Sequence, residues 1–94
     1  MNNQITPQKL NKYFEVTKKA FELAKVSKNR LNMNSERADF LDMIERYIKD
    51  AEHFEKKGAI VDAFAALNYA HGWLDAGARL GLFDVHDSRL FTVD

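Results

Sequence analysis

Four polar side chains share one side of an otherwise apolar segment, Gly58–Phe83, and their types could support chemistry. They are Asn68, His71, Asp75 and Arg79. His71 and Asp75 are four residues apart, so on a helix the carboxylate can accept a hydrogen bond from the imidazole. Asp75 and Arg79 repeat that spacing as an ion pair. A histidine oriented in this way is typical of a binding or metal site. The same stripe is also typical of a polar clasp that fixes the register of two packed helices.

A metal site would need more than these residues. Two ligands on one helix do not hold a metal ion, and a third would have to come from another helix or a partner chain. The chain has no cysteine, which excludes thiolate zinc sites and disulfides. It also lacks a glycine-rich phosphate loop, a His-Glu-x-x-His motif and a nucleophile placed beside a histidine. The sequence therefore predicts no catalytic residues, no cofactor, no bound metal and no enzyme.

The composition indicates one globular domain over residues 1–94, with 46% hydrophobic and 30% charged residues. No segment reads as a signal peptide or a membrane span, which predicts a cytoplasmic protein. Residues 1–34 hold seven basic and two acidic side chains, whereas residues 35–94 hold seven basic and twelve acidic ones. This asymmetry is typical of a basic helix packed beside an acidic one. The alternative is a nucleic-acid-associated module that uses the lysine-rich first helix.

Three helices are needed to position the polar stripe, at about residues 7–28, 36–57 and 59–80. Thr6 and Pro7 are a helix start signal, Asn34 or Ser35 could cap the second helix, and Gly58 ends it. Each helix has an apolar arc at the helical period. Because the third follows Gly58 directly, the last two form a hairpin. The sequence predicts an all-α, antiparallel three-helix bundle with a non-helical tail at 82–94.

The third helix has more apolar surface than two amphipathic neighbouring helices can cover. Gly72 and Gly77 each cost about 1 kcal/mol within a helix, which predicts close packing at both. The tail lies either in a groove between helices or against a second subunit. We therefore expect a non-enzymatic interaction or oligomerisation module, most simply a dimer or a complex with another protein. The residues expected at its interface are Tyr69, Trp73, Leu82, Phe83 and Phe91. A small metal- or ligand-binding protein centred on His71 and Asp75 is the remaining alternative.

Two segments carry a resemblance to a known family. Residues 54–58, Phe-Glu-Lys-Lys-Gly, and 68–75, Asn-Tyr-Ala-His-Gly-Trp-Leu-Asp, resemble the small archaeal family called domain of unknown function 357. The resemblance covers about forty residues and implies an all-helical bundle of archaeal origin with no assigned activity. In that family an Asp follows the turn glycine and would cap the third helix. Ala59 stands there in this chain, and Asp62 in the first turn replaces the cap only in part.

The hairpin is also similar to helical nucleotide-binding and ribonuclease domains of prokaryotic defence systems. Those domains carry an Arg followed by a His after four to six residues. Arg46 and His53 have six residues between them. The pair falls in the middle and last third of the second helix, not near the start of a closing helix, which argues against this interpretation.

Overall fold

The protein is an all-α bundle of three helices, as the hydrophobic periodicity predicts. The computed structural model describes residues 3–92, so the last part of the tail expected at 82–94 lies outside the described residues. Helix α1 spans Pro7–Val26, α2 spans Asn34–Lys56 and α3 spans Ile60–Leu80. Each boundary lies within two residues of its prediction. Within the described residues there is no strand.

Most helix ends follow from their local sequence. The Thr6 hydroxyl accepts a hydrogen bond from the Lys9 N–H at 3.1 Å and caps α1, with Pro7 in the first position. Gly58 and Gly81 have φ angles of 77° and 97°, the left-handed conformation in which glycine ends a helix without a Cβ clash.

The predicted cap of α2 is wrong. Met33 occupies the N-cap position, and no side chain hydrogen-bonds to the first turn there. The Asn34 carboxamide instead accepts from the Asn29 amide at 3.3 Å, and the Ser35 hydroxyl donates to Glu36 at 3.0 Å. Asn34 thus bonds to the loop before α2 and Ser35 to a neighbour within α2, so neither side chain serves as the cap. At α3 the N-cap is Ala59 without a side-chain bond, as predicted.

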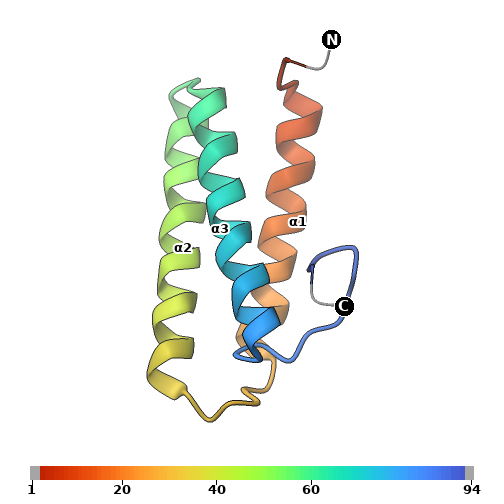
Figure 1. Cartoon of the computed structure of the whole chain (residues 1–94). Helices are drawn as coiled ribbons and strands as arrows, with labels where there is room; N and C mark the ends of the chain where they lie inside the picture. The colour runs from red at the N-terminus through yellow and green to blue at the C-terminus, as the bar shows by residue number, and fades with distance from the viewer. Residues whose placement is uncertain (1–2, 93–94) are drawn as a thin grey trace.

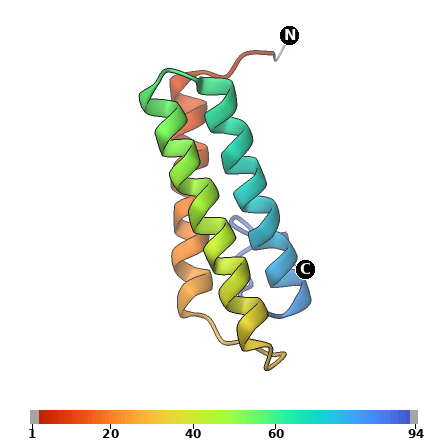
Figure 2. The same cartoon turned by 90° about the vertical axis from the view of Figure 1, so that its left-hand side faces the viewer.

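The three helices run alternately up and down along the bundle (Figure 1). Helices α2 and α3 form the predicted hairpin and have the most extensive mutual contact. Figure 2, in which α2 faces the viewer, shows α1 and α3 on either side of it. The segment after α3 turns back along the lower half of the bundle (Figure 1). We call residues 82–92 the tail; within the described residues it is not helical.

The tail completes the core of the molecule. Near the hairpin, the buried core side chains come from the three helices: Leu10, Phe14, Ala51, Ala63, Ala66 and Leu67. At the other end, tail residues pack into the same cluster as side chains of all three helices: Leu82, Phe83, Val85, Leu90 and Phe91. Of the two placements predicted for the tail, the structure has the groove between helices.

The two glycines within α3 differ in their surroundings. A Cβ added to Gly77 would overlap the buried Phe83 ring, so this glycine allows the tail to fold back over the last turn of α3. The prediction of close packing is confirmed there. At Gly72 it is wrong, because no heavy atom of the described residues, apart from its chain neighbours and the adjacent backbone of α3, lies within 4 Å of where a Cβ would be. Gly72 faces open space.

Candidate functional site

His71 joins three elements of the fold. Its Nε2–H donates to the Leu90 carbonyl oxygen in the tail at 2.6 Å, and the Thr17 hydroxyl of α1 lies 3.2 Å from Nδ1. Because a carbonyl oxygen only accepts, this geometry places the proton of a neutral ring on Nε2, and Thr17 then donates to Nδ1. Thr17 is fully buried, so His71 provides the partner that its hydroxyl cannot find in water.

Asp75 holds the next part of the tail. Its Oδ1 accepts the backbone N–H of Thr92 at 2.9 Å and lies 3.7 Å from Nε2 of His71. Among the residues that the structure describes, Asp75 forms no ion pair with Arg79, contrary to the sequence prediction. We call Thr17, His71, Asp75 and their two tail partners the tail clasp. A clasp was predicted between α2 and α3, but this one fastens the tail and α1 to α3.

The polar stripe therefore divides into two pairs. His71 and Asp75 are part-buried and belong to the tail clasp, whereas Asn68 and Arg79 are exposed on the outer side of α3. While the tail is in place, both ring nitrogens of His71 are used within the chain and neither can bind a metal ion. Over residues 3–92 no three His, Asp or Glu side chains are grouped so that they could hold a metal. This geometry favours the clasp over a ligand site.

A second polar group shapes the tail before it reaches His71. Asp87 accepts from the Arg89 guanidinium through both carboxylate oxygens, at 3.1 and 3.0 Å, and from the Arg89 backbone N–H at 3.0 Å. These hydrogen bonds favour the ionised carboxyl and lower the pKa of Asp87. The Asp87 carbonyl oxygen also accepts from the N–H groups of Leu90 and Phe91. The resulting turn points both apolar side chains into the core.

Arg37 makes a set of contacts that the sequence did not predict. Its Nη2 donates to the carbonyl oxygens of Ala24 and Lys25 at 3.1 and 3.0 Å, and its Nη1 donates to the Leu82 carbonyl at 2.6 Å. The guanidinium also lies over the Phe83 ring, 5.4 Å from its centre. Arg37 thus satisfies the last carbonyls of α1 and ties them to the tail.

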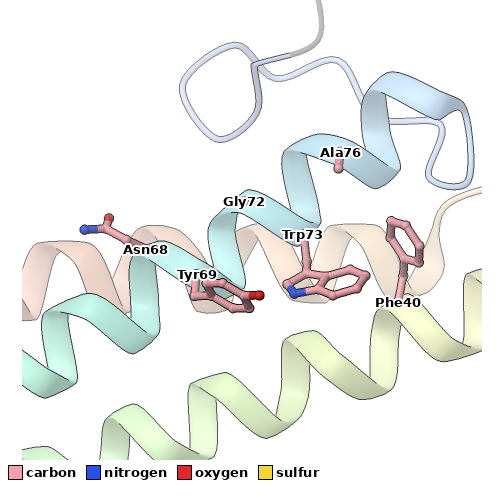
Figure 3. Close-up of a pocket in the computed structure, with 6 residues that line it drawn as sticks. All are labelled: Phe40, Asn68, Tyr69, Gly72, Trp73 and Ala76. Atoms are coloured by element: carbon pink, nitrogen blue, oxygen red, sulfur yellow. The ribbon is translucent and has the colours of Figure 1, made fainter.

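An apolar recess opens on the outer side of α3, where it adjoins α2 (Figure 3). The Trp73 and Phe40 rings pack edge to face with 4.8 Å between their centres, and the centres of the Tyr69 and Tyr47 rings are 4.5 Å apart. Gly72 lies between the two aromatic positions of α3 in Figure 3. The residues that line the recess are Phe40, Asn68, Tyr69, Gly72, Trp73 and Ala76. A second hollow continues it towards the hairpin and shares Tyr69.

The five predicted interface residues do not share one surface. Leu82, Phe83 and Phe91 are buried in the chain's own core, with 1%, 0% and 3% of their area exposed. They are corrected to core residues, because the tail folds back and does not extend to a partner. Tyr69 is 55% exposed and Trp73 is part-exposed, so these two stay candidates for an interface.

Three of the five lysines of α1, on which the nucleic-acid hypothesis rests, contact other side chains of the protein. Lys18 pairs with Glu52 at 3.0 Å, Lys25 pairs with Glu22 at 2.9 Å and lies over Phe21, and Lys9 lies over an aromatic ring of α3. These contacts reduce the charge that α1 can offer to phosphates. The hypothesis stays a prediction. Of the Arg46–His53 pair, Arg46 is bound to Asp42 at 2.9 Å on the exposed side of α2.

The comparisons with known proteins bear on the family alone. None of the helices within residues 3–92 has the length and apolar character needed to cross a bilayer. Searches of curated proteins and of solved structures gave no match. A family model described as "Protein of unknown function (DUF357)" matches residues 12–83, which is more than half of the chain and includes α2, α3 and most of α1. The chain belongs to this DUF357 family, as the motifs of the α2–α3 hairpin predicted.

Proposed function

We propose that this protein is a non-enzymatic interaction module that docks a helix of a partner on the outer face of α3. The observation that carries the proposal is Gly72. A glycine within a helix costs about 1 kcal/mol relative to alanine. At Gly77 the Phe83 ring accounts for that cost, whereas at Gly72 nothing among the described residues does. A helix packed against this face would need the close approach that only glycine permits.

The surroundings of Gly72 support the same proposal. Exposed apolar area lies along α3 at Val61, Tyr69 and Leu80. The recess between them is lined almost entirely by apolar groups, with Trp73 as an aromatic anchor. Tyrosine and tryptophan, the two aromatic residues of α3 that line the recess, are enriched at binding hot spots. His71 and Asp75, the two polar side chains of α3 that form the candidate histidine–carboxylate pair, serve the tail clasp on another side of the helix.

A site-specific photo-crosslinker tests the proposal. A benzophenone amino acid at Asn68, which borders the recess, should form adducts in cells that express the protein. The same amino acid at Lys49, on the far side of α2, is the matched control and should form none. Gly72→Glu should abolish the adduct at position 68, because the added side chain fills the open space while leaving the monomer room to fold. Equal labelling at both positions, or labelling that survives Gly72→Glu, would contradict the proposal.

A cytoplasmic location and an archaeal origin stay predictions. Fractionation of expressing cells tests the first.

A further inference from the structure

We infer that the helix docked on α3 is α3 of a second copy of this chain, packed antiparallel across a two-fold axis. The inference rests on the proposed function, since it names the partner of the same face. It follows from the order of residues along the exposed side of α3. The buried side of this helix is already covered by α1, α2 and the tail.

The exposed residues of α3 form two rows with a spacing of seven. Asp62, Tyr69 and Ala76 make one row, and Ala65, Gly72 and Arg79 make the other; all six are exposed. Along the chain the rows alternate at intervals of three and four residues, which is the spacing of the a and d positions in a coiled coil. At 100° per residue they stay within an arc of about 100°, narrow enough to face one partner helix. All six residues remain exposed, although the Tyr69 ring also contacts the Tyr47 ring of α2.

The centre of the seam fits an antiparallel copy. In such a pair, a residue of one row lies across from a residue of the other row on the second helix. With the two-fold axis midway between Tyr69 and Gly72, Tyr69 faces Gly72 of the partner subunit. The aromatic side chain then fills the open space at the glycine. Symmetry repeats the contact on the other side of the axis.

The same register matches the rest of the seam without adjustment. Ala65 faces Ala76 of the partner subunit, so two small side chains let the backbones approach. One turn further out, Asp62 faces Arg79 of the partner subunit, so the interface ends in an ion pair on each side. If the two helices instead packed in parallel through the same face, each residue would face the same residue of the second copy. Two Asp62 carboxylates and two Arg79 guanidinium groups would then repel each other.

The size of the face sets the expected strength of the pairing. Helix α3, with its 21 residues, is about 30 Å long, and together with the adjoining side of α2 it is about 20 Å wide. Two such faces bury roughly 1,200 Å², the lower limit of specific interfaces. The chain has a formal net charge of zero, so two copies do not repel at long range. We therefore expect a reversible dimer whose population rises with concentration.

Cysteine crosslinking tests the orientation, and the chain offers a background free of other thiols. A mixture of the Ala65→Cys and Ala76→Cys chains should form a disulfide-linked pair on mild oxidation. Ala65→Cys alone should not, because the two copies of position 65 lie about 16 Å apart along the antiparallel seam, and a disulfide needs Cα atoms within about 7 Å. Efficient crosslinking of Ala65→Cys with itself would indicate a parallel pair and overturn the inference.

Charge reversal tests the register. Asp62→Arg and Arg79→Asp should each raise the dimer dissociation constant at least tenfold in sedimentation experiments, because each places like charges together on both sides of the axis. The double variant should return to within about threefold of the original value, since the pair is restored in reverse. Lys49→Asp, with the same charge change as Arg79→Asp on the far side of α2, is the control and should leave the dimer unchanged. A double variant whose dimer dissociation constant is as high as that of the single variants would refute this register.

The two proposals can fail separately. If the crosslinker at Asn68 captures a different protein, and sedimentation finds a monomer at all concentrations, the interaction module stands and the homodimer falls. If position 68 captures nothing and the chain stays a monomer, both fall. An adduct of twice the 10.9 kDa chain mass supports both.

Discussion

Replacement of Arg37 by alanine is the substitution from which we expect the largest loss of stability among the polar residues of this protein. Arg37 connects the end of α1, the first turn of α2 and the start of the tail through one guanidinium group. In the alanine variant, the carbonyl oxygens of Ala24, Lys25 and Leu82 all lose their charged donor. The Phe83 ring loses the cation above it.

The magnitude follows from these contacts. Each of the three short hydrogen bonds contributes about 0.5–1.5 kcal/mol net, and the cation–π contact contributes about 0.5–1 kcal/mol at a part-exposed site. At the Lys25 carbonyl oxygen, water can partly replace the lost guanidinium donor, because this hydrogen bond lies at the surface. We therefore expect a loss of about 2–4 kcal/mol, which for a domain of this size lowers Tm by about 10–25 °C. Arg37→Lys should recover less than half of the lost stability, because a lysine ammonium lacks the planar, forked donors with which the guanidinium reaches three carbonyl oxygens.

Urea denaturation followed by circular dichroism measures this loss. The matched control is Arg46→Ala, which removes an exposed ion pair with Asp42 on the same helix. It should cost about 0.5 kcal/mol or less. If Arg37→Ala falls within about 0.5 kcal/mol of this control, the guanidinium does not act as the connection described here.

Four further substitutions test other parts of the fold. Gly77→Ala should destabilise the protein by about 1–3 kcal/mol in thermal unfolding, because the new methyl group meets the buried Phe83 ring. Gly72→Ala should instead stabilise the monomer by up to about 1 kcal/mol, measured at concentrations where sedimentation finds no dimer. Equal effects at the two glycines would refute this distinction. His71→Phe should cost about 1–3 kcal/mol and speed amide exchange in the tail, because Thr17 loses its buried partner; unchanged exchange would show that the tail does not depend on the clasp. Thr6→Ala should cost about 1 kcal/mol in urea denaturation through loss of the α1 cap, and no loss would mean that the cap bond does not contribute.

The helices could be predicted because their signals are local. The Thr6 cap and the left-handed glycines at 58 and 81 act on neighbouring residues, and the apolar period identifies the buried side of each helix. The tail could not be placed in this way. Its apolar residues have no period, and they suit a groove in the same chain as well as a second subunit. Only the packing of all three helices creates the groove that they fill.

Only part of the site could be predicted, because the sequence pattern shows local neighbours and not long-range ones. Spacing within α3 shows which residues neighbour His71 along the helix, but its partners Thr17 and Leu90 lie 54 and 19 residues away. Arg37 carried a signal that could have been used. It sits in the first turn of α2, where the helix dipole disfavours a cation. A basic residue there needs a compensating contact, and the carbonyl oxygens of Ala24 and Lys25 at the end of α1 supply it.

The tail clasp and the proposed seam lie on different sides of the same helix, and this separation has a consequence. His71 and Asp75 hold the tail against the side of α3 that faces α1, which leaves the small residues on its outer arc uncovered. Substitutions in the clasp should therefore lower stability without altering the register of the dimer, and charge reversals in the seam should alter association without unfolding the monomer. If one set of variants changed both properties together, α3 would carry a single coupled site. The helix would then not be divided into one side that holds the fold and another that recognises a partner.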